Sequence, residues 1–154
     1  MMKALELKVP PPLVALIVGV AMWGIAKVAP LWEMENSLCW SLTTVLVLIG
    51  VAFSVAGFLA FRRAKTTVNP MQPGKATSLV NTGVYRRTRN PMYVGLLFIL
   101  FAWFVFLRSP WSLVGPVAFF AWINWLQIVP EERILSTLFG EEYARYKAQV
   151  RRWL

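Results

Sequence analysis

A basic, turn-forming stretch runs directly into an apolar segment near the middle of the chain: Gly83-Val-Tyr-Arg-Arg-Thr-Arg-Asn-Pro-Met-Tyr-Val-Gly95. Arginine, tyrosine and asparagine side chains are crowded where a membrane helix would begin, and polar groups at that depth cost free energy unless they face partners, water or a ligand. A helix start also carries unpaired backbone N–H groups, which suit an anionic group. The stretch therefore predicts a polar ligand held at the membrane surface.

A second group of polar residues lies at the end of the last apolar segment. Asn124, Gln127 and Glu131 are spaced by three and four residues, which places them on one face of a helix, and Glu132 follows. An amide at membrane depth either joins helices or belongs to a site, and joining is the simpler interpretation of Asn124 alone. The paired carboxylates indicate either a ligand site or a solvated helix end.

The residue types that are missing exclude several kinds of chemistry. The chain has no histidine and no aspartate, and Cys39 is its one cysteine. A Ser-His-Asp triad, an intramolecular disulfide and a multi-cysteine metal site are therefore excluded, and we expect no metal. The net charge of +9 comes from residues that flank apolar runs, which is typical of anchoring against anionic lipid, so we expect no nucleic-acid partner.

The composition is that of a membrane protein, because 58% of the 154 residues are hydrophobic. The sequence predicts a single all-α integral membrane domain with about four transmembrane helices, a structured cytoplasmic loop and a C-terminal amphipathic helical segment. The expected helices cover residues 12–29, 38–61, 92–107 and 111–129, the loop covers 62–91 and the amphipathic segment covers 131–154.

The loops predict the orientation. The central loop carries seven basic residues and no acidic one, whereas Glu33 and Glu35 lie between the first two segments. The positive-inside rule therefore places the central loop and both termini in the cytoplasm. Arg108-Ser-Pro-Trp111 is a tight hairpin, which brings the two polar groups of residues to the same end of the third and fourth helices. A pocket of guanidinium, phenol, amide and carboxylate groups suits a zwitterionic ligand with a cationic centre.

The segments Tyr85–Gly95 and Glu131–Tyr146 together resemble the isoprenylcysteine carboxyl methyltransferase and phospholipid methyltransferase superfamily. The resemblance covers roughly residues 70–153. It implies an integral membrane enzyme that uses S-adenosylmethionine and releases S-adenosylhomocysteine. It also implies the cofactor-binding residues, which are Tyr85, Arg89, Asn90, Pro91, Tyr93, Gly95, Glu131 and Glu132.

Two positions depart from the family's pattern. Asn90 stands where the motif Arg-His-Pro-x-Tyr-x-Gly has histidine, so hydrogen bonding is retained but titration is lost. Gln127 stands where some members have an arginine that steers the substrate carboxylate. The catalytic residue stays unassigned, with Gln127 and Arg133 as candidates, and Arg133, Arg151 or Arg152 could replace the missing arginine.

The resemblance implies methyl transfer to a lipophilic or lipid-borne acceptor. Without histidine, deprotonating an amine falls to glutamate, tyrosine or water, which favours a carboxylate such as a prenylcysteine-like substrate. The alternatives are a phospholipid amine N-methyltransferase and a non-catalytic lipid-binding or assembly protein. The expected location is a bacterial or archaeal cytoplasmic membrane, and the oligomeric state stays open.

Overall fold

Residues 6–29, 31–64 and 73–154 are described by the computed structural model, and they form helices and no strand. The five α-helices are α1 (Pro11–Val28), α2 (Asn36–Arg63), α3 (Pro91–Leu107), α4 (Val114–Trp122) and α5 (Val129–Gln149). Short 3-10 turns cover Pro73–Lys75, Gly83–Arg86 (η3) and Pro110–Leu113, and a π-helical turn covers Ile123–Ile128. The predicted all-helical membrane fold is confirmed, while residues 65–72 of the predicted loop lie outside the described residues.

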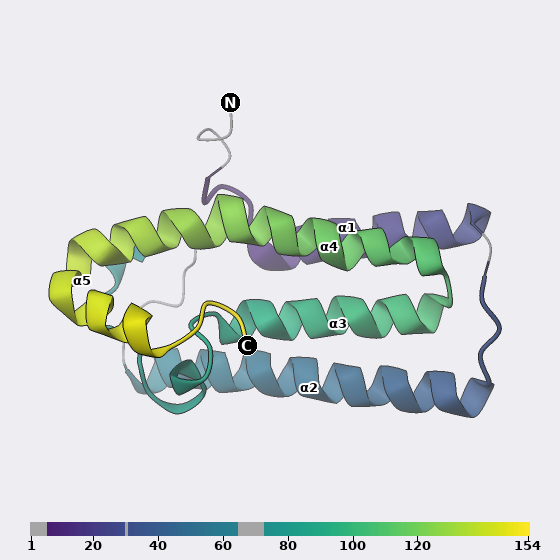
Figure 1. Ribbon diagram of the computed structural model, residues 1–154, viewed down its shortest axis with the longest axis horizontal. Coiled ribbons are helices and arrows are strands. Elements are labelled where there is room, and N and C mark those ends of the chain that lie inside the picture. The colour runs from purple at the N-terminus through teal and green to yellow at the C-terminus, as the bar shows by residue number, and fades with distance from the viewer. Residues whose placement is uncertain (1–5, 30, 65–72) are drawn as a thin grey trace.

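The long axes of α1 to α4 run side by side (Figure 1). Within the described part of the chain, three helical stretches are long and apolar enough to cross a membrane: Pro11–Val28, Asn36–Arg63 and Pro110–Gln149. Helix α3 is apolar but has 17 residues, or about 26 Å, slightly less than a typical hydrocarbon core of about 30 Å. Large apolar side chains of α1 and α2 are exposed, as expected where helices face lipid.

Helices α2 and α3 pack closely because glycines face each other at their contact. A Cβ atom added to Gly95 would lie 2.5 Å from the carbonyl oxygen of Gly50, and one added to Gly50 would lie 2.7 Å from the carbonyl oxygen of Gly95. Ser54 also lies against Gly95. Small residues allow such close backbone approach between membrane helices.

We expect Gly95→Ala to destabilise the protein by about 1–3 kcal/mol, because the added methyl group has to push α2 and α3 apart. Gly24→Ala is the matched control, since a Cβ at Gly24 meets nothing within 4 Å. The control should be neutral or slightly stabilising, because alanine favours helix over glycine. Thermal unfolding of the detergent-solubilised variants measures both effects. Equal unfolding midpoints for the two variants would show that the contact between α2 and α3 does not require a glycine at position 95.

Helical backbone continues past residue 129, where the fourth apolar segment is predicted to end, because α4 runs through the π-helical turn into α5. Pro130 would ordinarily break a helix, since its ring clashes with the carbonyl group of Leu126. The preceding π-helical turn changes the local spacing, and the Leu126 carbonyl oxygen accepts a hydrogen bond from the Leu7 N–H at 3.1 Å. The chain changes direction later, at Gly140, whose φ of 48° is non-helical.

After that bend, α5 curves back so that the chain's last residues lie over the start of α3 (Figure 1). We call this end of the bundle, where α2 ends and α3 begins, the loop end. At the opposite end, Arg108 closes the α3–α4 hairpin with a left-handed φ of 50°. Its guanidinium donates to the Asn36 side chain at 2.7 Å, which ties the hairpin to the start of α2.

Candidate active site

A cavity of about 100 Å³ at the loop end is enclosed by α2, α5 and the segment between α2 and α3. Both groups of polar residues seen in the sequence reach it, as the hairpin between α3 and α4 predicts. Its polar wall includes Arg89, Asn90, Glu131 and Glu132. The remaining wall is mostly aromatic and aliphatic, and includes Phe61, Tyr85, Leu135, Phe139, Tyr143 and Tyr146.

Glu132 is the centre of a buried charge cluster. Its carboxylate lies 2.9 Å from Nη2 of Arg89 and accepts two hydrogen bonds from Arg152, at 3.0 Å from Nε and 2.7 Å from Nη2. The side chains of Arg89 and Glu132 are each 10% exposed. The Arg152 bonds form a bidentate pair, and hydrogen bonding to Glu132 raises the pKa of the Arg152 guanidinium. Glu132 therefore joins α5 to both the central loop and the C-terminal residues.

The C-terminal residues after α5 hold one wall of this site in place. The Arg89 N–H donates to the carbonyl oxygen of Arg151 at 2.9 Å, and the Asn90 side-chain amide donates to that of Arg152 at 2.9 Å. The buried Thr88 hydroxyl also donates to the Arg152 carbonyl oxygen, at 3.2 Å. Nη1 of Arg152 donates to Asn124 at 3.0 Å. Asn90 and Asn124 thus both hold the C-terminal residues in place.

Glu131 lies in a second, separate polar cluster. One of its carboxylate oxygens accepts hydrogen bonds from the Tyr93 hydroxyl at 2.6 Å and from the Gln127 amide at 2.5 Å. Gln127 belongs to the π-helical turn and is buried, as is Tyr93 in the first turn of α3. This cluster joins α3 to α5, and among the described residues both of these hydrogen bonds go to the same Glu131 oxygen.

Tyr85 forms an aromatic part of the cavity wall, and a hydrogen bond to its backbone holds it in place. Its carbonyl oxygen accepts a hydrogen bond from the Tyr146 hydroxyl at 2.7 Å, and its ring meets the Phe61 ring edge-on at 5.5 Å. Burial raises the pKa of Tyr85, so its phenol stays neutral. A neutral aromatic wall beside carboxylates can receive a cationic group.

Other residues proposed from the sequence lie away from the cavity wall. Pro91 starts α3, Gly95 lies in the α2–α3 contact, and Tyr93 reaches the site through Glu131. Arg133 points to Glu6 at 3.4 Å and is 60% exposed. Of the three arginines considered as replacements, Arg152 is the one whose guanidinium reaches the charge cluster. The sequence offered no sign of Thr88, because its contact depends on the path of the chain after α5.

Arg89 also has an unsatisfied donor. Within the described parts of the chain, its Nε is buried without a hydrogen-bond partner, although its Nη2 meets Glu132. A buried donor left unpaired costs free energy, and this one belongs to a residue that lines the cavity.

Comparison with known proteins identifies the family. A family model described as phospholipid methyltransferase matches residues 38–142. The chain belongs to the phospholipid methyltransferase family. The family match begins in α2 and ends within α5, so it includes Arg89, Glu131 and Glu132. The C-terminal residues that carry Arg152 lie beyond it.

Curated relatives of this family member include two methyltransferases. It is 30% identical over 107 residues to protein-S-isoprenylcysteine O-methyltransferase A of Arabidopsis thaliana, covering 69% of this chain and 54% of that protein. It is 30% identical over 128 residues to protein-S-isoprenylcysteine O-methyltransferase of Saccharomyces cerevisiae, covering 77% and 50%. The chain thus spans about half the length of these two relatives. An uncharacterized protein of Haemophilus influenzae is 48% identical over 63 residues, which cover 41% of this chain and 100% of that protein. No solved structure matches the chain.

Proposed function

We propose that this phospholipid methyltransferase family member is a membrane enzyme that transfers a methyl group from S-adenosylmethionine to a lipophilic acceptor. The observation that carries the proposal is the cavity wall itself, where Arg89 lines one small space together with Glu131 and Tyr85, and the Nε of Arg89 has no hydrogen-bond partner among the described residues. Family membership supports methyl transfer, and the apolar helices support a membrane-borne acceptor.

The side chains that line the cavity have the chemistry needed to bind the charged groups of this cofactor. Arg89 supplies an unpaired donor for the cofactor's carboxylate, and the second oxygen of Glu131 suits its ammonium group or its ribose hydroxyls. Tyr85 and Phe139 supply aromatic faces for a sulfonium. When bound, the cofactor supplies an activated methyl group on that sulfonium.

The cavity has to widen when the cofactor binds. Its volume of about 100 Å³ is below the roughly 300–1,000 Å³ of typical small-molecule sites. The segment from residue 76 to residue 90 forms one wall and contains little helix, whereas α5 forms the other. We infer that the earlier part of this segment, residues 76–80, moves outward, while hydrogen bonds to the C-terminal residues keep Arg89 and Asn90 in place and Arg152 keeps Glu132 in position.

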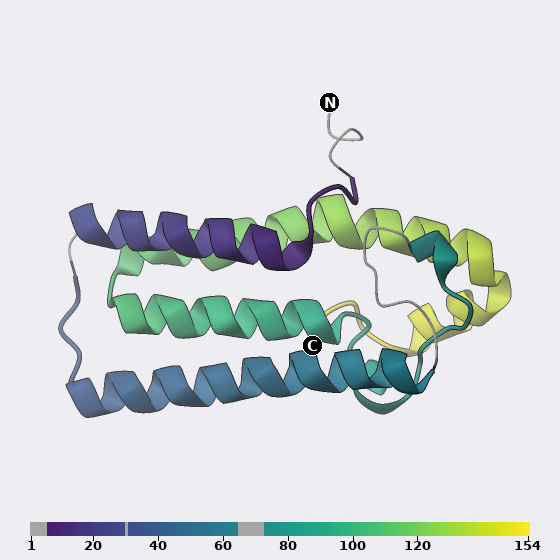
Figure 2. The same ribbon diagram turned by 180° about the vertical axis from the view of Figure 1, so that it is seen from behind.

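The acceptor approaches from the lipid. An apolar groove of about 840 Å³ runs between α1 and α2 along α3 and includes Leu96, one turn beyond Tyr93. Figure 2 shows α1 and α2 on opposite sides of α3. The groove is wide enough for an acyl or isoprenoid chain, which supports a lipophilic acceptor.

We propose a carboxylate as the accepting group, because a carboxylate is already ionised and needs no general base. The names of the two curated methyltransferases support this choice. The description of the family model supports a phospholipid as the second candidate, with its amine as the acceptor. The basic loop supports a cytoplasmic location for the loop end and both termini, in a bacterial or archaeal cytoplasmic membrane.

Binding of S-adenosylhomocysteine tests the proposal without a known acceptor. We expect it to raise the unfolding midpoint of the solubilised protein, because a ligand stabilises the state that binds it. Glu131→Gln keeps an oxygen for Tyr93 and Gln127 but removes the charge, so its affinity should fall about tenfold or more in calorimetry. Glu141→Gln, at an exposed carboxylate of the same helix, should bind like wild type.

Failure of S-adenosylhomocysteine to stabilise the wild-type protein would contradict the proposed methyltransferase function and favour a non-catalytic lipid-binding protein. Transfer of labelled methyl to a farnesylated cysteine analogue and to phosphatidylethanolamine then identifies the acceptor. A carboxylate should react with little pH dependence above about pH 5, because its reference pKa is near 3.3–4.3. An amine should react faster as the pH rises toward its own pKa, and activity on the amine alone would replace the carboxylate assignment.

A further inference from the structure

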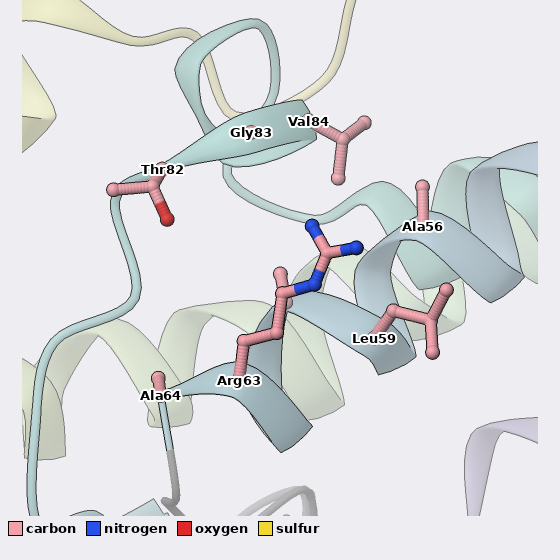
Figure 3. Close-up of a pocket in the computed structure, with 8 residues that line it drawn as sticks. Ala56, Leu59, Arg63, Ala64, Thr82, Gly83 and Val84 are labelled. Atoms are coloured by element: carbon pink, nitrogen blue, oxygen red, sulfur yellow. The ribbon is translucent and has the colours of Figure 1, made fainter.

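A separate cavity of about 570 Å³ lies between the last turns of α2 and η3. Its walls include Ala56, Leu59, Ala60 and Arg63 of α2, with Thr82 and Val84 from the loop (Figure 3). The chain neighbours of these residues, Phe61 and Tyr85, line the candidate active site instead. The two cavities therefore lie on different faces of the same two elements.

Arg63 brings a positive charge without an internal counter-ion to this cavity. Figure 3 shows its guanidinium and the Thr82 hydroxyl pointing into the same space. No ion pair with Arg63 occurs in the portions of the chain described, and the sequence has no acidic residue between Glu35 and Glu131. The carboxylate of Glu132, in the candidate active site, is already paired with two arginines. The counter-ion of Arg63 in this cavity therefore has to come from outside the protein.

The other half of the cavity is apolar and lies on a helix long and apolar enough to cross a membrane. Ala56, Leu59 and Ala60 form it, and on the same turns of α2 the side chain of Phe58 is 44% exposed. The Arg62 guanidinium lies over the Phe58 ring, 6.0 Å from its centroid, and so covers apolar surface outside this cavity. The cavity thus spans the boundary between the apolar surface of a spanning helix and a basic loop, where phospholipid phosphates lie.

We propose that this cavity binds one anionic phospholipid, separately from the candidate active site. The phosphate contacts the Arg63 guanidinium and the Thr82 hydroxyl, and the start of an acyl chain lies against Ala56 and Leu59. A soluble phosphate would use the polar half alone. The apolar wall, supplied by a membrane helix, favours the lipid as the source of the anion.

Native mass spectrometry of the full chain, titrated with phosphatidylglycerol in a zwitterionic detergent, measures the binding. We expect Arg63→Ala to weaken phosphatidylglycerol binding about tenfold, because a charge-assisted phosphate contact is lost. Thr82→Val should weaken it by a smaller factor. Arg62→Ala removes the same charge one residue away and should change the affinity less than about threefold. Arg63 and Thr82 are exposed, so both variants should unfold at the wild-type temperature without lipid.

Two further measurements distinguish a lipid phosphate from a soluble phosphate as the bound anion. Phosphatidylcholine should bind at least tenfold more weakly than phosphatidylglycerol, and inorganic phosphate should not compete at equal concentration. Equal losses in Arg62→Ala and Arg63→Ala would overturn the proposal, since they would show binding to diffuse positive charge. Competition by inorganic phosphate at equal concentration would overturn the lipid assignment. Neither outcome depends on whether the protein binds S-adenosylhomocysteine.

Discussion

Glu132→Ala should destabilise the protein by about 3–5 kcal/mol and abolish measurable binding of S-adenosylhomocysteine. The substitution removes the carboxylate that neutralises both Arg89 and Arg152, so two guanidinium groups are left without their partner in a site where Arg89 is 10% exposed. Breaking a buried ion pair from one side costs this much because the remaining charge stays desolvated. Denaturant unfolding in detergent and calorimetry measure the two effects.

Glu141→Ala is the matched control for this variant. Glu141 lies on the same helix and is exposed, so its loss should change stability by no more than about 0.5 kcal/mol. If Glu132→Ala unfolded like this control, the charge cluster would not hold the loop end together. Glu132→Gln separates charge from shape, because the amide keeps one acceptor oxygen while it loses the charge.

Arg152→Ala should weaken S-adenosylhomocysteine binding at least tenfold and release the C-terminal residues. The variant loses the bidentate pair with Glu132 and the bond to Asn124, and hydrogen bonds to charged groups contribute about 1.5–3 kcal/mol each. The Arg152 side chain is 33% exposed, so hydration by water will offset part of the expected loss in stability. Calorimetry measures the affinity, and limited proteolysis detects release of the residues after Gln149.

Arg151→Ala removes the adjacent charge and serves as the control. The Arg151 side chain is exposed, and its contact with Arg89 uses the backbone carbonyl group, which the substitution keeps. Arg152→Lys should fall between the two, because lysine retains the charge but cannot form the bidentate pair. Identical affinities for Arg151→Ala and Arg152→Ala would remove Arg152 from the site.

The sequence alone determined the helical membrane fold and which end of it carries polar chemistry. Four apolar runs set the helices, because burial in lipid depends mainly on local composition and length. The short hairpin at Arg108 forced α3 and α4 together, which brought Arg89 and Glu132 to one end. Local patterns suffice for such inferences, since each depends on residues close in the chain.

The tertiary structure decided how those residues are used. Gly95, part of a family motif, proved to be a contact between α2 and α3, and Pro130 does not end its helix because a π-helical turn precedes it. The role of Arg152 depends on the bend at Gly140 and on the path of the chain after α5. No periodic pattern encodes that path. It is fixed by hydrogen bonds and ion pairs between residues about 20 to 60 positions apart, and these form only when the helices have packed.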